Sequence, residues 1–102
     1  MIIMGEYWVS HKRMNKEGSR IIKVKAMKRK EEGGLGIPIV YEREEVVKSI
    51  EAGNDWYTCK KKEKNIYTRG EKIHVLPIDD EKFIRTDRNN IKSDNLGELP
   101  DF

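Results

Sequence analysis

The sequence predicts a small α+β protein, with one short helix packed on an antiparallel sheet of about five strands in the order β-β-α-β-β-β. Three observations lead to this fold class. Residues 20–28 alternate between apolar and basic side chains, residues 42–52 carry the one convincing helical pattern, and short β-rich segments follow that helix. Strands grouped around a single helix are typical of a two-layer α+β domain.

The first two strands are predicted to form an antiparallel hairpin. Residues 6–10 are aromatic and β-branched, and residues 12–18 are polar, as expected of a turn. In residues 20–28 the period-2 pattern places Ile22, Val24 and Ala26 on one face and Lys23 and Lys25 on the other. We therefore expect one apolar and one basic face.

The helix is predicted over residues 42–52, after a glycine-rich loop at residues 30–36. Val46, Val47 and Ile50 form its apolar stripe, and glutamates occupy its first turn, where the helix dipole favours acids. Gly53 is placed to end the helix in a left-handed conformation.

Three further strands are predicted at residues 55–61, 72–76 and 83–86, and residues 66–68 either extend a strand or line a loop. Pro77 ends the second of these strands. The polar tail, residues 87–102, carries Leu96, Leu99 and Phe102, so we expect part of it to pack back on the sheet. We expect one domain over residues 1–102, with residues 1–4 frayed.

Composition indicates a folded protein without a membrane segment. Of the 102 residues, 24 are Leu, Ile, Val or Phe, which exceeds the roughly 20 % floor for folding. No apolar run approaches the roughly 20 residues of a membrane span, and no signal peptide is recognisable. A single cysteine excludes an internal disulfide framework. We expect a cytoplasmic protein.

Charge is unevenly distributed along the chain. Residues 1–30 carry a net charge of +7 and residues 55–72 carry +3, whereas residues 31–54 carry −4 and residues 73–102 carry −3. Lysines with interleaved aromatic residues are typical of sheet surfaces that hold single-stranded nucleic acid. The candidate residues for binding nucleic acid or another polyanion are Lys23, Lys25, Lys28, Arg29, Lys60, Lys61, Lys62, Trp56 and Tyr57.

Two other interpretations of the lysines remain open. They can form a solvated surface that protects sheet edges from aggregation. Alternatively, the chain is a protein-interaction module, a regulator or inhibitor of mobile-element or viral origin, that pairs through an exposed sheet edge. The sequence does not fix the oligomeric state.

The sequence favours a non-enzymatic protein with no cofactor and no metal. Cys59 lies in mid-strand, where a small buried side chain is more common than a nucleophile. One cysteine and two scattered histidines lack the spacing of a zinc site. The acidic residues 79–81 are better explained as a turn between strands.

Several segments together resemble a family of small prokaryotic domains of unknown function. They are residues 44–53, the aromatic strand at residues 56–58, the Arg-Thr strand at residues 84–86, and the ending Asp94-Asn95-Leu96 with Leu99-Pro100. The resemblance implies an α+β fold and no known activity. Its polar cluster is Arg85, Thr86, Asp94 and Asn95, which either fixes the tail beside the last strand or forms a small recognition site.

Overall fold

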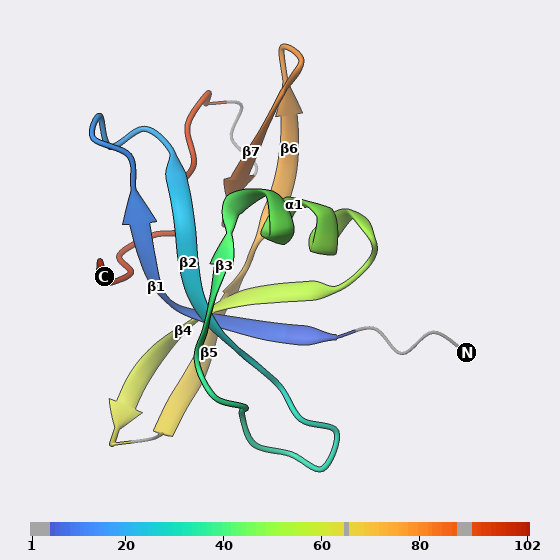
Figure 1. Cartoon of the computed structure of the whole chain (residues 1–102), viewed down its shortest axis with the longest axis vertical. Coiled ribbons are helices and arrows are strands. Elements are labelled where there is room, and N and C mark those ends of the chain that lie inside the picture. The colour runs from blue at the N-terminus through green and yellow to red at the C-terminus, as the bar shows by residue number, and fades with distance from the viewer. Residues whose placement is uncertain (1–4, 65, 88–90) are drawn as a thin grey trace.

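The computed structural model describes residues 5–64, 66–87 and 91–102, so the expectation of frayed residues 1–4 lies outside it. The described chain forms seven strands and one helix (Figure 1). In chain order they are β1 (Glu6–Met14), β2 (Ile21–Lys28), β3 (Ile39–Glu42), α1 (Arg43–Glu51), β4 (Asp55–Glu63), β5 (Ile66–Lys72), β6 (His74–Ile78) and β7 (Glu81–Arg85).

The strands form a five-stranded sheet in the order β3-β2-β1-β4-β5 and a separate β6-β7 hairpin. The predicted α+β class is confirmed. The prediction that the sheet is wholly antiparallel was wrong, because β1 and β4 pair in parallel. The chain passes through α1 between β3 and β4, and such a crossover allows a strand to return in the same direction as its neighbour.

The helix is confirmed within one residue at each end, although the strand that precedes it was missed. Glu42 is the N-cap, and its side chain and that of Glu45 form a reciprocal capping box. Two glutamates therefore cap this helix, whose N-cap position has no Ser, Thr, Asp or Asn. Gly53 has φ +103°, which confirms the predicted left-handed residue after the helix.

One face of the sheet is covered by α1, by the β6-β7 hairpin and by the tail. Val46 and Val47 of α1 enter this core, and the ring of Tyr7 stacks on that of Trp56 at 4.4 Å. The other buried residues of this cluster are Val9, Ile21, Val24, Ala26, Ile73, Ile84, Leu96 and Leu99.

The prediction that Ile22 shares the buried face of Val24 was wrong. Ile21 is fully buried, whereas Ile22 is 41 % exposed. Arg13 pairs with Lys23 but Met14 pairs with Ile21, so β2 contains one extra residue at this point. Such a bulge reverses the alternation of side chains beyond it.

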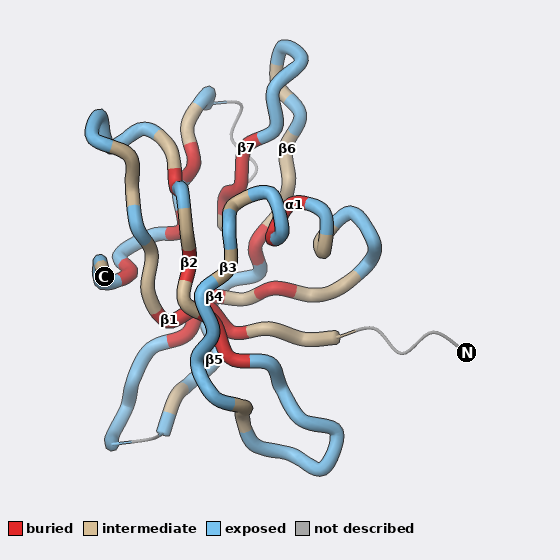
Figure 2. Tube along the Cα trace, viewed as in Figure 1, coloured by how far each residue is buried: buried red, intermediate tan, exposed pale blue. Residues whose placement is uncertain are grey.

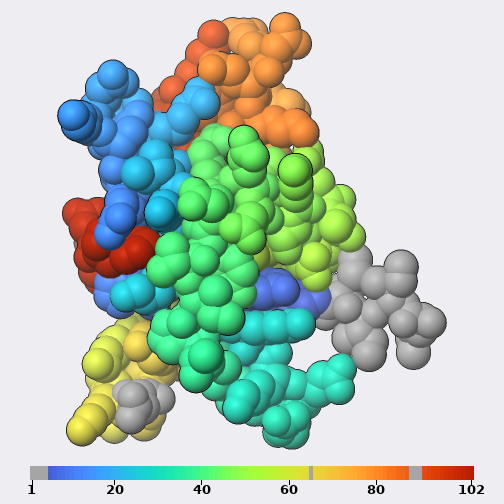
Figure 3. Space-filling view, viewed as in Figure 1, coloured from blue at the N-terminus to red at the C-terminus, as the bar shows by residue number. Residues whose placement is uncertain are grey.

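The other face of the sheet carries a smaller cluster of Trp8, Met27 and Cys59, with Leu35, Tyr57 and Tyr67 packed against it. Figure 2 shows that buried segments concentrate where the strands converge, while the far ends of β4 and β5 are exposed. The main chain of the tail pairs with the end of β1, since Lys12 N donates to Pro100 O at 2.9 Å. In Figure 3 the red C-terminal residues accordingly lie against the blue β1.

Across the described ranges, no helix has the length and apolar character needed to cross a membrane.

Candidate polyanion-binding face

The face of the sheet opposite α1 collects cations from four strands and the adjoining loop. Here β1 lies between β2 and β4, which brings the two basic blocks of the sequence together. We call this the cationic face. It is defined by Arg13, Lys25, Arg29, Lys61 and Arg69, together with His11.

A bulge in β1 brings His11 to the cationic face. Val9 pairs with Ala26 and His11 pairs with Lys25, so Ser10 is an extra residue in β1. Without it, strict alternation would place Ser10 and not His11 on the face of Trp8. Burial, with smaller contributions from Lys25 and Lys61, lowers the pKa of His11 below its ordinary value. His11 pairs with Lys25 of β2 and lines a pocket together with Lys61 of β4.

Aromatic rings hold most of these cations against the face. The guanidinium of Arg69 lies 4.5 Å from the ring centre of Tyr57, and that of Arg29 lies 5.6 Å from Trp8. Near the tail, Arg13 and Lys25 lie 4.7 and 5.0 Å from the ring centre of Phe102. Contacts of this kind orient a cation without neutralising its charge.

Most of the positive charge on this face is uncompensated. Within the described part of the chain, Arg69 is the one of these five cations that has an ion pair, at 3.8 Å from Glu6. Glu6 is also engaged by the indole of Trp8, which donates to it at 2.7 Å. Arg13 is engaged by the tail, since its Nε donates to Phe102 O at 2.9 Å. Lys25, Arg29 and Lys61 are therefore the cations of this face that are available to an anionic ligand.

Only some of the predicted basic residues lie on the cationic face. Lys25, Arg29 and Lys61 lie on the cationic face, as described above. Lys23 belongs to the same side of β2 but pairs with Glu42 at 3.6 Å. Lys28 lies over Tyr7, a residue of the opposite face. Lys60 and Lys62 are exposed on the projecting end of β4 and alternate with Lys61.

The two predicted aromatic residues, Trp56 and Tyr57, lie on opposite faces of β4. Trp56 is 1 % exposed, and its indole donates to Ser49 Oγ at 2.9 Å within the core. It therefore offers no surface to a nucleobase, and its assignment to a binding surface is corrected here. Tyr57 is half-buried on the cationic face beneath Arg69.

Sequence reasoning missed His11, Arg13 and Arg69 as members of this face. The position of His11 depends on a bulge that no local sequence pattern predicted. Arg69 lies next to Gly70, where the pairing of β4 with β5 also shifts register. The basic character of residues 55–72 was the one available signal, and it did not single out Arg69.

The family-like cluster does not form one open site. Asp94 is buried, and its carboxylate accepts from Ile21 N at 2.8 Å and from Ile84 N at 2.9 Å. Arg43 donates to the same carboxylate through Nε at 2.8 Å and Nη2 at 2.9 Å. This ion pair joins the tail to the starts of β2 and α1 and to β7, which is the arrangement expected of a residue that fixes the tail.

Of the other three residues of that cluster, Arg85 has its own partners, whereas Thr86 and Asn95 bind each other through the main chain. Arg85 is buried and donates to both carboxylate oxygens of Asp87, at 2.6 and 3.0 Å, and to Ser93. The hydrogen bond with Asp87 raises the pKa of Arg85. Thr86 N donates to Asn95 O at 2.9 Å, and Gly97 N donates to Asn95 Oδ1 at 2.8 Å.

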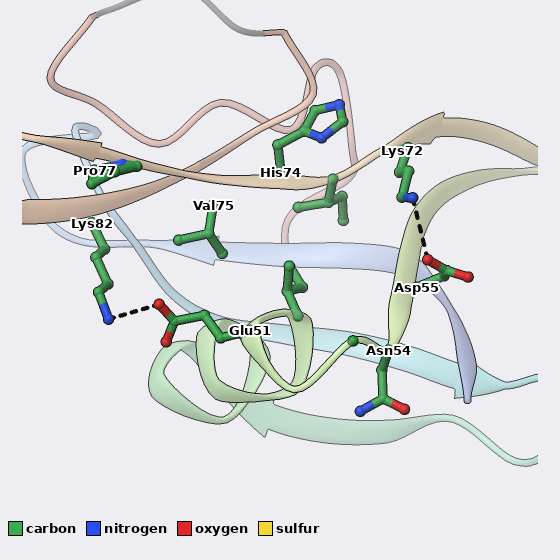
Figure 4. A pocket seen from close by; sticks show the side chains of 11 residues that line it. Glu51, Asn54, Asp55, Lys72, His74, Val75, Pro77 and Lys82 are labelled. Carbon is green, nitrogen blue, oxygen red and sulfur yellow. Dashed lines mark ion pairs between the residues drawn. The ribbon is translucent and has the colours of Figure 1, made fainter. Parts of the chain in front are cut away.

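A separate pocket of about 520 Å³ lies between the end of α1 and strand β6. Figure 4 shows that its charged side chains pair within the pocket. Lys82 lies 2.7 Å from Glu51, and Lys72 lies 3.2 Å from Asp55. Because these charges neutralise one another, the pocket is a weaker candidate for an anionic ligand than the cationic face.

Cys59 is not placed as a nucleophile, and the described residues hold no cluster that could form a metal centre. Burial raises the pKa of the Cys59 thiol to about 11, so the thiol stays protonated at neutral pH. Its hydrogen points to Val9 O at 3.5 Å. No group of three or more His, Cys, Asp or Glu side chains lies close enough in the described ranges to hold a metal ion.

The fold and this face define a small mixed α+β protein with a cationic sheet surface. A family model described as a protein of unknown function, DUF3892, matches residues 8–100. The chain therefore belongs to this family, in agreement with the resemblance seen in its sequence. Searches of curated proteins and of solved structures returned no match.

Proposed function

We propose that this protein binds nucleic acid, or a polyanion of similar charge, on its cationic face. The observation that carries the proposal is the meeting of Lys25 and Lys61, from the two basic blocks of the sequence, on either side of β1. Their charges have no acidic partner in the described chain, so a phosphate backbone would supply the missing counter-charge.

The chemistry of the neighbouring residues supports a flexible, phosphate-based interaction. Half-buried tyrosines beside cations offer stacking surfaces, and cations held on aromatic rings stay near the sheet plane. The arrangement supplies phosphate contacts and stacking without a pattern of donors fixed for one base sequence. We therefore expect binding with little sequence preference.

The proposal is tested by fluorescence anisotropy of a labelled oligonucleotide at about 50 and 200 mM salt. We expect a micromolar Kd that weakens strongly at the higher salt concentration, because phosphate contacts release counterions. The variant Lys25→Gln with Lys61→Gln should lower the slope of log K against log salt by about 1.4. This value follows from about 0.7 ions released per contact on a single strand.

The matched control is Lys16→Gln with Lys48→Gln, which removes the same charge from an exposed turn and from α1. Its slope should equal that of the unaltered protein. If the two double variants behave alike, or if no oligonucleotide binds at either salt concentration, the cationic face is not a nucleic-acid-binding surface.

A second candidate function, protein interaction, is supported by strand β3. This strand is an edge of the five-stranded sheet, and its region exposes Ile37, Ile39 and Val40 by 77, 45 and 49 %. A partner strand could add to this edge and cover these side chains. Such binding should be insensitive to salt and should be lost on Ile39→Lys while surviving the two lysine substitutions above.

A further inference from the structure

We propose that the pocket between His11 and Lys61 holds one phosphodiester of a single-stranded nucleic acid, whose adjacent base stacks on Tyr67. This inference rests on the proposed function. It adds the position of one phosphate subsite and a preference for single-stranded over double-stranded nucleic acid. The pocket has a volume of about 430 Å³ and lies between the middle of β1, the middle of β4 and the tail. Its lining includes Cys59 and Leu99, and its polar side chains come from β1, β4, β5 and the tail, which contributes Glu98.

In the described part of the chain, the hydrogen bond of the His11 ring uses Nδ1 and leaves Nε2 without a protein partner. Ser10 Oγ lies 2.8 Å from His11 Nδ1 and 3.4 Å from Lys25 O. When Nδ1–H donates to the Ser10 oxygen, Nε2 carries the lone pair of the neutral ring; when the Ser10 hydroxyl donates to Nδ1, Nε2 carries the hydrogen. In the protonated ring both nitrogens are donors, so Nε2 can donate to a phosphate oxygen whichever tautomer precedes it.

The charged side chains around His11 are mainly cationic, and its neighbours come from every adjacent element. They are Arg13 of β1, Lys25 of β2, Cys59, Lys60 and Lys61 of β4, Tyr67 of β5, and Glu98 and Phe102 of the tail. Glu98 is the one acidic side chain among these groups. The unligated site therefore repels a proton on His11, whereas a bound phosphate reverses the local potential.

This reversal links phosphate binding to proton uptake. In the free protein, burial and the two lysines keep the pKa of His11 below its ordinary value, so the ring is neutral at pH 7. A phosphodiester between His11 and Lys61 raises that pKa. Affinity should therefore increase as the pH falls through the interval between the bound and free pKa values, and should be constant above it. A rise of one pKa unit would give about a tenfold gain in affinity.

Tyr67 supplies the preference for single strands. Its ring is half-buried on the cationic face, and Tyr67 pairs with Lys61 across β4 and β5. An unpaired base can reach such a ring, whereas the bases of a duplex remain stacked on one another. Tyr67→Leu should weaken binding at least about fivefold, whereas Tyr67→Phe should preserve it.

The test is the affinity of a labelled dT oligonucleotide at about pH 5.5 and pH 8, at constant salt, for the full chain and two variants. Thymidine has no group that titrates in this interval. We expect binding to be about three- to tenfold tighter at the lower pH. This gain should be absent in His11→Gln and retained in His74→Gln, which alters the other histidine of the chain. A blunt duplex of equal length should bind more weakly.

A direct measurement covers the case in which His11→Gln does not fold. The pKa of the His11 imidazole, followed by NMR in the unaltered protein, should rise when dT is added. If dT binds in a salt-dependent way but neither its affinity nor the His11 pKa responds, the subsite is refuted while the proposed function stands. Equal binding of duplex and dT refutes the stacking role of Tyr67. Absence of binding at both pH values refutes both proposals.

Discussion

At the scale of single residues, Asp94 is a buried carboxylate that joins the tail to β2, α1 and β7. Its side chain is 0 % exposed, and four hydrogen bonds satisfy its two oxygens. Two of the donors belong to Arg43, whose side chain is 17 % exposed, and the other two are main-chain amides of β2 and β7. A buried carboxylate is stable only with partners of this kind.

Asp94→Asn should therefore destabilise the protein by about 3 kcal/mol, because it leaves the Arg43 guanidinium without its counter-charge in a partly buried position. The free energy of unfolding in urea measures this effect. Asp101→Asn is the control, since the Asp101 side chain is 77 % exposed and its pairing with Lys12 spans 3.6 Å. That change should stay within about 0.5 kcal/mol. Equal effects of the two substitutions would show that Asp94 does not fix the tail.

At the scale of elements, bulges decide which side chains reach the cationic face. The register of β4 with β5 passes from Tyr57–Lys72 to Cys59–Arg69, so β5 has an extra residue next to Gly70. A Cβ atom on Gly70 would lie 2.6 Å from Thr58 Oγ1 and 3.1 Å from Thr58 O. The same Thr58 hydroxyl accepts from Glu71 N at 3.0 Å. Glycine is thus required for close approach at this bulge.

Gly70→Ala should lower the free energy of unfolding by about 1–3 kcal/mol, because the new methyl group overpacks against Thr58. Thermal or urea unfolding of both single variants and of the double variant with Thr58→Ala measures the coupling. The double variant should lose less stability than the sum of the single variants, since Thr58→Ala removes the closest clashing atom. Strict additivity would mean that the approach of Gly70 to Thr58 does not constrain β5.

Local residue patterns were sufficient to predict the elements that depend only on neighbouring residues. The pattern of Val46 and Val47 with Gly53 located the helix, and the alternation of Lys23, Val24, Lys25 and Ala26 located β2 with its correct faces. The same patterns were insufficient to predict features that depend on which strands pair and in which register. The exposure of Ile22, the parallel pairing of β1 with β4, and the place of His11 all depend on register, which alternation alone does not specify.

The residues of the candidate site were likewise predictable from the sequence only in part. Lys25 and Lys61 could be selected because they belong to basic segments, and Tyr57 because it is interleaved with them. Trp56 carries an equally suggestive signal but lies on the opposite face of β4, where it completes the core with Tyr7 and Tyr41. One position along a strand thus separates a surface ring from a core ring.

At the scale of the whole molecule, the sheet order converts a charge pattern along the chain into two different faces. The basic blocks, residues 1–30 and 55–72, supply β1, β2, β4 and β5 of the main sheet. The acidic blocks supply β3, α1 and the β6-β7 hairpin, and α1 and that hairpin cover the opposite face. A net charge of only +3 therefore conceals a strongly cationic surface.

The most direct test of this account maps the binding surface by NMR, with ¹⁵N-labelled protein titrated with a dT oligonucleotide at about 50 mM salt. We predict that the amide signals of His11, Lys25, Lys61 and Tyr67 shift together with one Kd, while those of α1 remain in place. Shifts confined to α1 or to edge strand β3, or no shifts at saturating oligonucleotide, would contradict the claim that the cationic face binds nucleic acid.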